Sequence, residues 1–167
     1  MSNRSLKDRV GKSQPFDSSA QEAHLNLMRT ASELAGPLHA LFKPHKLTDA
    51  SYNTLRILRG HQAQGENRGI RASRIGCEMV VRVPDVTRIV DRLVDMELAS
   101  RNACDLDRRV VYVSITQKGL DLLSKLDDPV KQMHQRTLGH MTDTELLQLN
   151  TLLEKARAAV EESEQNK

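Results

Sequence analysis

Arginine side chains recur at helical spacing in the segment Arg82–Leu93, beside a matching set of apolar residues. Arg88 and Arg92 are four residues apart, so a helix would place them on one face. The apolar side chains follow the i, i+3, i+4, i+7 spacing of a single buried face: Val86, Ile89, Val90 and Leu93. A guanidinium binds phosphate, or the O6 and N7 atoms of guanine with two hydrogen bonds. The pattern therefore predicts an amphipathic helix that packs on a small core and presents cations to an anionic partner.

Each polar residue of this segment suits a particular contact. Arg88 is the candidate for a base contact, and an intrahelical ion pair with Asp85 or Asp91 is the alternative. Thr87 suits a phosphate or a thymine methyl group, and Arg92 suits a phosphate. Asp85 either accepts a hydrogen bond from cytosine N4 or caps the helix. We expect Pro84 in the first helical turn, where its missing N–H costs nothing.

Short elements on both sides must hold this helix in place. The sequence predicts a short helix over 72–79 and then the arginine-bearing helix over 83–96. The segment 98–102 and the alternating run Val111–Ile115 predict two strands, joined by a charged loop over 103–109. A short helix, a turn, a second helix and a hairpin form the order of a winged helix-turn-helix, whose second helix enters the major groove of DNA.

Longer helices flank this region. Capping-box patterns at Ser18 and Ser19 predict the start of a helix that bends at Gly36-Pro37 and ends at 43–45. Thr48 caps a further helix to about Gly60, and another helix spans 116–138 with an interruption at Pro129. The last helix follows Thr142 and carries a narrow seam spaced 3, 4, 3, 4: Leu146, Leu149, Leu153, Ala156 and Val160. The fold class is therefore mainly α with a small β-hairpin.

Composition restricts the function classes. Aromatic residues make up 2% of the 167 residues, so the core is aliphatic and the stacking platforms of single-strand binders are missing. The formal net charge is +3, and two cysteines build no disulfide framework, which suits a reducing cytoplasm. No apolar run is long enough to span a membrane. Because the sequence has no Gly-rich phosphate loop, zinc motif or nucleophile elbow, we expect no enzyme, no catalytic residue and no cofactor.

The sequence resembles the MarR (multiple antibiotic resistance) family of transcriptional regulators over about Ala20 to Ala158. The most specific parts are Val86–Leu93, then Asp107-Arg108-Arg109, then Ile115-Thr116-x-x-Gly119. In that family these stretches form the recognition helix, the wing tip and the exit from the wing. Leu47-Thr48 followed by Leu55–Leu58 matches the family's second helix.

The resemblance implies a winged helix-turn-helix repressor that binds a palindromic operator in double-stranded DNA as a homodimer. In such proteins the first and last helices of two subunits intertwine, which would cover the seam on the last helix; packing within its own subunit is the alternative. At the wing, the family pattern places an arginine in the minor groove with an aspartate that orients it, here Arg109 and Asp107, while Arg108 is a neighbouring phosphate or minor-groove contact; a solvated turn is the alternative. Arg82 stands where the family usually has a small hydroxyl cap, and adds a cation near the DNA backbone.

Four basic residues and few apolar ones over 1–17 predict a flexible basic arm. The resemblance implies three further segments: an N-terminal dimerisation helix over 18–47, the winged helix-turn-helix over 48–119 and C-terminal dimerisation helices over 120–167. The arm is either a solvated tail or reaches DNA or the partner subunit. A small aromatic or anionic effector would enter the cleft between the dimer helices and the winged domain, near His24, Met28, Arg29, His45 and Tyr52; ordinary packing or surface exposure is the alternative for each.

Two other functions stay open. One is a helical dimerisation or protein-interaction module that has lost DNA binding. The other is a regulator that responds to oxidation or to a metal. The histidines lack the spacing of a metal site, so we expect no metal.

Overall fold

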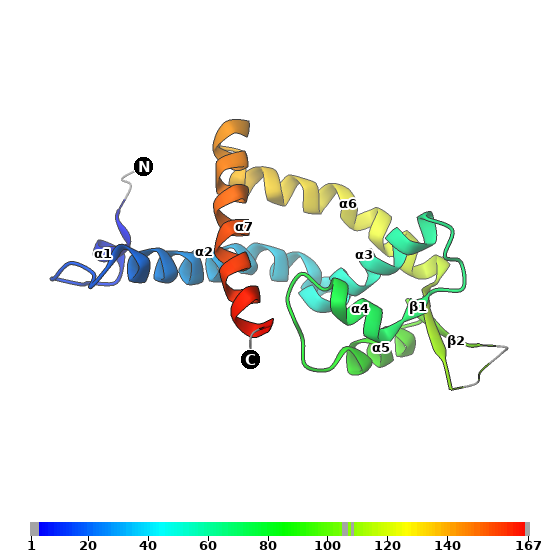
Figure 1. Ribbon diagram of the computed structural model, residues 1–167. Coiled ribbons are helices and arrows are strands. Elements are labelled where there is room, and N and C mark those ends of the chain that lie inside the picture. Colours follow the sequence, from blue (N-terminus) through cyan, green and yellow to red (C-terminus); the bar gives the residue numbers. More distant parts are fainter. Residues whose placement is uncertain (1–3, 105–106, 108, 166–167) are drawn as a thin grey trace. The chain divides into compact units, whose positions relative to one another are not determined.

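The chain folds into helices with one small sheet. The computed structural model describes residues 4–104, 107 and 109–165, and of 162–165 it describes the backbone alone. The elements in chain order are α1 (Leu6–Arg9), α2 (Ser19–Phe42), the 3-10 helix η1 (Lys43–His45), α3 (Asp49–Ala63), β1 (Ile70–Arg71), α4 (Ala72–Glu78), α5 (Val86–Asp95), β2 (Ala99–Ala103), β3 (Val111–Ile115), α6 (Gln117–Leu138) and α7 (Asp143–Gln165) (Figure 1). They fall into two compact units, Met1–Val130 and Lys131–Lys167.

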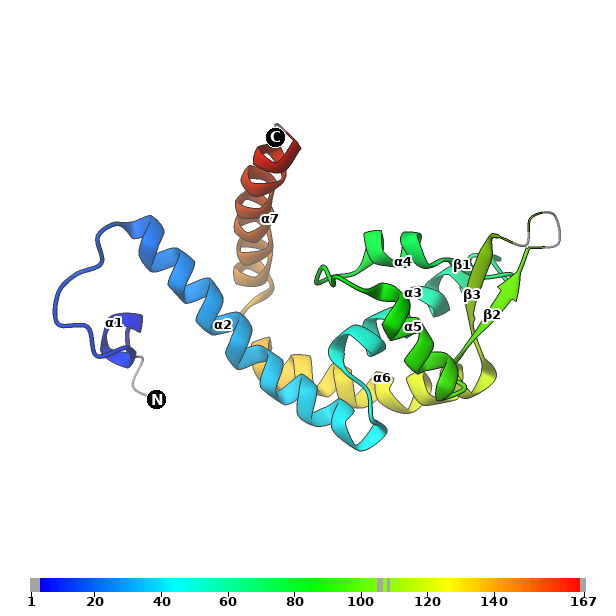
Figure 2. The same ribbon diagram turned by 90° about the horizontal axis from the view of Figure 1, so that it is seen from below.

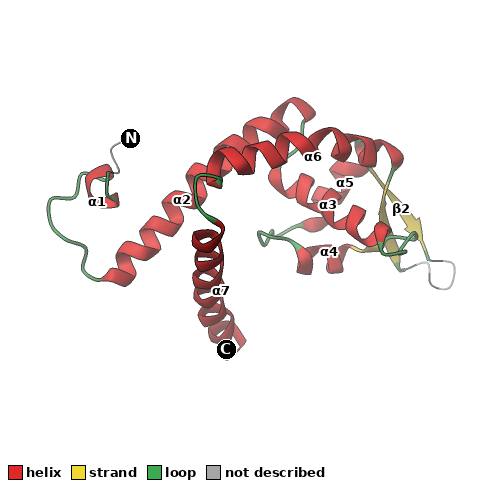
Figure 3. Ribbon diagram, turned by 90° about the horizontal axis from the view of Figure 1, so that it is seen from above, coloured by secondary structure: helices red, strands yellow, loops and turns green. Residues whose placement is uncertain are grey.

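The predicted fold class, mainly α with a small sheet, is confirmed (Figure 3). Of the helices that the described residues form, none combines the length and the apolar character that crossing a membrane requires.

The N-terminal segment contains regular structure that the sequence analysis did not predict. Ser5 caps α1: its Oγ accepts the Asp8 N–H at 3.3 Å, and Asp8 Oδ2 accepts the Ser5 N–H at 3.2 Å. Leu6 is 6% exposed, so this one turn packs its apolar residue inward. The sequence predicted a flexible basic arm over 1–17 and no helix within it, because a four-residue helix is too short to show periodicity.

Helix α2 is a continuous helix from its cap to the start of the winged region. Ser18 Oγ accepts the Gln21 N–H at 3.1 Å, as the capping pattern predicted. The helix continues through Pro37 and ends at η1, where Lys46 takes a left-handed conformation with φ of 55°. Phe42 is fully buried at this end and stacks on Tyr52, with 4.3 Å between ring centroids.

The winged region contains α3, α4, α5 and a three-stranded antiparallel sheet in the order β1-β3-β2 (Figure 2). Ile70 pairs with Val113, and Ala99 pairs with Ile115. The sequence predicted the hairpin and an extended piece at 69–71, but it did not predict that this piece joins the sheet. The core of the winged region is aliphatic, with side chains from each of these helices and strands: Leu55, Leu58, Ile70, Ile75, Val90, Leu93, Leu98, Ala99, Val113 and Ile115.

An ion pair anchors the first part of α6 to α3. Thr116 Oγ1 caps α6 by accepting the Gly119 N–H at 3.1 Å. Farther along, both oxygens of Asp127 accept from Arg59, each at 2.8 Å, and Arg56 lies 3.3 Å from the same carboxylate. The hydrogen bonds from Arg59 lower the pKa of Asp127 below its ordinary value of 3.8.

This shift gives a pH-dependent stability. A carboxylate with a depressed folded-state pKa stabilises the fold above its unfolded pKa, and the contribution is lost as pH falls through the folded pKa. Asp127→Asn is therefore expected to lower the free energy of unfolding by roughly 1 kcal/mol at pH 7, given that Asp127 is 40% exposed. The difference between variant and wild type should shrink as pH falls below about 3.8. Urea unfolding at fixed protein concentration, at pH 7 and pH 3, measures both values.

Arginine variants provide the control for this ion pair. Arg59→Ala should cost more than Arg56→Ala, because Arg56 is 47% exposed and makes the longer contact. Equal losses, or a wild-type advantage over Asp127→Asn that does not change with pH, would contradict the assignment.

The second unit consists of the end of α6 and α7. The capping box predicted at its start is present: Glu145 Oε2 accepts the Thr142 N–H at 2.8 Å, and Thr142 Oγ1 accepts the Glu145 N–H at 3.3 Å. The hydrogen bond from the Thr142 N–H lowers the pKa of Glu145. Within the seam, the three leucines are half-buried, while Ala156 and Val160 are exposed. Leu147 and Leu152 beside the seam are 68% and 64% exposed.

Candidate nucleic-acid interface

The arginine-bearing helix α5 begins at Val86, three residues later than predicted. Asp85 is its N-cap, and its Oδ1 accepts the Arg88 N–H at 3.0 Å. Pro84 therefore precedes the helix, and its expected place in the first turn is wrong. A carboxylate at this position accepts a hydrogen bond from an otherwise unpaired N–H. The positive end of the helix dipole also stabilises its charge, so the helix starts directly after Asp85.

Three contacts fix α5 to the scaffold. Val90 and Leu93 are fully buried. Asp91 forms an ion pair with Arg101 on β2. Arg92, which the sequence analysis assigned to a phosphate, donates from Nη2 to the Lys46 carbonyl at 2.9 Å. Because Lys46 follows η1, Arg92 joins α5 directly to the end of α2.

Arg88 differs from the other charged residues of α5. It is exposed, and in the part of the chain that the structure describes its guanidinium has no hydrogen bond or ion pair. The two aspartates considered as partners are engaged elsewhere, Asp85 with the main chain and Asp91 with Arg101. The exposed residues around the start of α5 are Arg82, Pro84, Asp85, Thr87 and Arg88.

The turn between α4 and α5 carries an apolar surface that the sequence analysis missed. Met79 is 8% exposed and contacts Thr54, and Asn53 Oδ1 accepts the Val80 N–H at 2.8 Å. These contacts pin the start of the turn to α3. Val80 and Val81 are nevertheless 85% and 70% exposed. Nothing in the sequence distinguishes these two adjacent valines from core residues.

At the wing, the aspartate holds the main chain. Asp107 Oδ1 accepts the Arg109 N–H at 2.9 Å, and the Asp107 carbonyl accepts the Val110 N–H at 2.9 Å. Asp107 thus fixes the backbone of Arg109, and the expectation that it orients an arginine side chain stays a prediction. Arg109 is exposed. Arg108, the third residue predicted here, lies outside the described residues.

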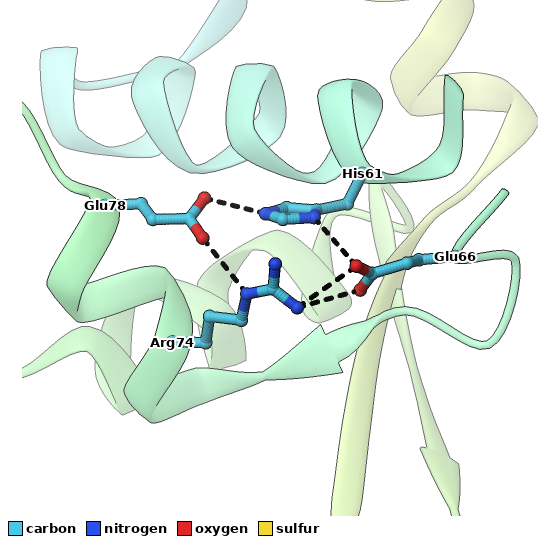
Figure 4. A network of polar contacts seen from close by, with 4 residues as sticks. All are labelled: His61, Glu66, Arg74 and Glu78. Atoms are coloured by element: carbon cyan, nitrogen blue, oxygen red, sulfur yellow. Dashed lines mark hydrogen bonds and ion pairs between the residues drawn. The ribbon is translucent and has the colours of Figure 1, made fainter. Parts of the chain in front are cut away.

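A network of four charged or polar side chains holds α4 against α3 (Figure 4). His61 Nε2 lies 2.7 Å from Glu78 Oε2, and Arg74 Nε donates to Glu78 Oε1 at 3.1 Å. Arg74 Nη1 also reaches Glu66 Oε1 at 3.1 Å, and His61 Nδ1 lies 3.5 Å from that oxygen. The hydrogen bond with His61, followed by that from Arg74, lowers the pKa of Glu78. The network positions the first helix of the helix-turn-helix.

Of this network, the sequence offered one signal, the i, i+4 spacing of Arg74 and Glu78. His61 and Glu66 come from another helix and from the loop after it, so their participation depended on the tertiary fold.

The predicted effector residues do not form one cluster. Met28 and Arg29 both line an open cavity beside α1. His24 is exposed on α2, His45 ends η1, and Tyr52 is half-buried against Phe42. Among residues 4–104, 107 and 109–165, no three His, Cys, Asp or Glu side chains are grouped so that they would hold a metal ion.

Comparison with known proteins places this geometry in a family. The family model described as MarR family matches residues 47–111. A MarR transcription factor from Planctomyces limnophilus is 39% identical, with 84% of this chain and 98% of that chain covered and a TM-score of 0.63. The chain belongs to the MarR family.

Other solved structures share the fold. BpsR of Bordetella bronchiseptica, whose DNA binding is regulated by 6-hydroxynicotinic acid, is 25% identical, with coverage of 86% and 98% and a TM-score of 0.71. MepR of S. aureus, solved in complex with DNA, is 20% identical, with coverage of 82% and 96% and a TM-score of 0.68. MarR-family proteins are winged-helix transcription regulators and not enzymes. In this MarR-family chain, α4 and α5 are the helix-turn-helix and β2–β3 is the wing.

Proposed function

We propose that this MarR-family protein is a transcriptional repressor that binds a palindromic operator in double-stranded DNA as a homodimer and is released by a small molecule. The observation that carries the proposal is Arg88. Its side chain is exposed and unpaired within the described chain, at the start of a helix that Asp91 and Arg92 fix to the scaffold. A rigid helix that presents an unsatisfied guanidinium at its N-terminal end is suited to reading guanine in the major groove.

The remaining predicted contacts have supporting roles. Thr87 and Asp85 lie beside Arg88 on the exposed side of the first turn. Arg109 on the wing would enter the minor groove, and Arg82 and Arg108 would add phosphate contacts. Arg92 keeps a phosphate contact only through the donors that the Lys46 carbonyl does not use. The proposed DNA-binding domain is the segment 48–119.

Exposed apolar side chains on two long helices support the homodimer. Leu25, Leu27 and Met28 on α2 are 38%, 42% and 60% exposed. On α7, Leu147 and Leu152 are exposed beside the seam Leu146, Leu149, Leu153, Ala156 and Val160. Apolar groups of this kind on both terminal helices are expected to be covered by a second copy. The proposed dimerisation segments are 18–47 and 120–167.

A ligand-responsive function is supported by the related protein BpsR, whose DNA binding responds to 6-hydroxynicotinic acid. We accordingly propose that the effector is a small aromatic or anionic molecule.

Fluorescence anisotropy with duplex DNA from the protein's own upstream intergenic region tests the DNA-binding function. The repressor should bind with a Kd of roughly 10 nM or below, against a much weaker Kd for a scrambled duplex of equal length. Affinity should fall by roughly 10³-fold or more between 50 and 200 mM salt, because phosphate contacts release counterions. A protein-interaction module that has lost DNA binding would show no salt-dependent binding to either duplex.

A further inference from the structure

Two adjacent valines in the turn between α4 and α5 take no part in the contacts assigned so far. Val80 and Val81 are the two most exposed of the large apolar side chains in the described part of the chain. The turn lies at the N-terminal end of α5, on the side of the helix-turn-helix away from the wing (Figure 2). Apolar side chains in such a place are expected to have a partner that the single chain does not supply.

The turn is fixed on both sides of the valine pair. Met79 before the pair is buried, and Val83 after it packs against the core. The side-chain oxygen of Asn53 on α3 accepts the Val80 N–H at 2.8 Å. Because packing and a hydrogen bond hold the chain here, the two valine side chains are held outward by the fold.

The charges around the valine pair favour an anionic partner. Arg82 follows the pair directly, and Arg88 lies on the first turn of α5; both are exposed. The carboxylates nearest in sequence are engaged within the chain, Glu78 in the network with α3 and Asp85 with the main chain. The chain around the pair therefore presents arginines together with apolar groups.

The size of the pair argues against a protein partner. Each side of a stable protein interface contributes about 800 Å², and two valine side chains supply a small part of that area. The exposed residues that follow in the turn are Arg82, Pro84 and Asp85, so the apolar surface does not continue along it. A small apolar contact within a polar and cationic surface fits DNA better than a second copy of the chain.

We propose that Val80 and Val81 contact thymine methyl groups in the major groove, beside the base that Arg88 contacts. The C5-methyl of thymine is the apolar group that a base pair presents in this groove. The first residues of a recognition helix contact base edges, and the turn before α5 accompanies them. The inference rests on the proposed function and goes beyond it, because it assigns recognition of A·T pairs to the turn. Asn53 is the positioning residue of this contact.

Uracil in place of thymine tests the contact, because it removes the C5-methyl group and keeps the base pair. Fluorescence anisotropy compares the full chain on two duplexes: the operator mapped by footprinting in the upstream intergenic DNA, and the same operator with dU at each dT. The methyl ratio is the Kd for the uracil duplex divided by the Kd for the thymine duplex. Burial of one methyl group is worth about fourfold in affinity, and a homodimer covers two half-sites, so the wild-type ratio should be roughly ten or more. A ratio near one would overturn the proposal.

Substitutions in the turn and on α5 locate the contact. Val80→Ala with Val81→Ala should bind the thymine duplex about as weakly as the wild type binds the uracil duplex, and its methyl ratio should fall to near one. Because both side chains are exposed, its free energy of unfolding in urea should match that of the wild type. Thr87→Ser is the matched control: it removes the other methyl group suited to thymine and keeps the hydroxyl, and it should retain the wild-type ratio. A ratio that is lost in Thr87→Ser and kept in the valine variant would overturn the assignment.

Two variants of Asn53 test the positioning role. Asn53→Ala removes the acceptor of the Val80 N–H and should lose most of the methyl ratio. Asn53→Asp keeps an acceptor at the same place and should restore the ratio. A merely structural role would lower affinity for both duplexes equally and leave the ratio unchanged, which would remove Asn53 from the proposal.

The outcomes separate this inference from the proposed function. If the protein binds the thymine operator and its methyl ratio is near one, the inference alone is wrong and the proposed function stands. If the protein binds neither duplex, the proposed function fails and the inference fails with it. If the valine variant instead weakens self-association in sedimentation, the pair belongs to a contact between subunits, which also overturns the inference.

Discussion

The Arg88→Ala variant is expected to bind operator DNA with a Kd roughly 5- to 150-fold higher than that of the wild type, a loss of about 1–3 kcal/mol. The reason is geometric. Arg88 is exposed and unpaired within the described chain, so its removal breaks no internal contact and should cost only the proposed contact with DNA. Binding to a scrambled duplex, which depends on phosphate contacts, should change little. Fluorescence anisotropy with both duplexes at the same salt concentration gives the ratio.

Two further variants separate charge from geometry. Arg88→Lys keeps the charge but cannot make the bidentate contact, so it should bind operator nearly as weakly as the alanine variant. Arg92→Ala should weaken binding to operator and scrambled DNA alike, because Arg92 joins α5 to the Lys46 carbonyl and its proposed DNA contact is to a phosphate. Unchanged operator binding by Arg88→Ala, or an equal loss on both duplexes, would remove Arg88 from the base-reading role.

The Gly69→Ala variant is expected to lose roughly 3–4 kcal/mol of unfolding free energy, enough to unfold a large fraction of a marginally stable protein. Gly69 has φ of 87°, a conformation that other residues rarely adopt. A Cβ added there would overlap the backbone carbonyl of Val113 and lie 2.8 Å from the Ser114 nitrogen. Because these atoms belong to the central strand of the sheet, they cannot move without breaking strand pairing. Urea unfolding followed by circular dichroism measures the loss.

Gly65 provides a matched control in the same loop. Its φ is 93°, but among the described residues nothing lies within 4 Å of an added Cβ. Gly65→Ala therefore reports the cost of the left-handed conformation alone, about 1 kcal/mol. If the two variants lost the same free energy, the close approach of Gly69 to β3 would not be the cause of its effect.

Elements with a local cause were predictable from the sequence. The spacing of Val86, Ile89, Val90 and Leu93 and the alternation over Val111–Ile115 define a helix and a strand within a few residues. Thr48, Thr116 and Thr142 cap helices through bonds that span three residues, so the pattern and the bond coincide. The same local patterns predicted the order of the winged fold and the resemblance to the MarR family. They also placed Arg88 on the recognition helix and Arg109 on the wing.

What the sequence alone did not give depends on residues that are close only after folding. Arg92 meets Lys46 across 46 residues, Arg59 meets Asp127 across 68 and His61 meets Glu78 across 17. Asp85 and Asp91 lie three residues before and after Arg88, so the sequence allowed either as its ion-pair partner. In the structure Asp85 binds the main chain and Asp91 pairs with Arg101. Thus periodicity determined which helix faces outward. Only the packing of α5 on its neighbours determined which of its arginines is left to contact another molecule.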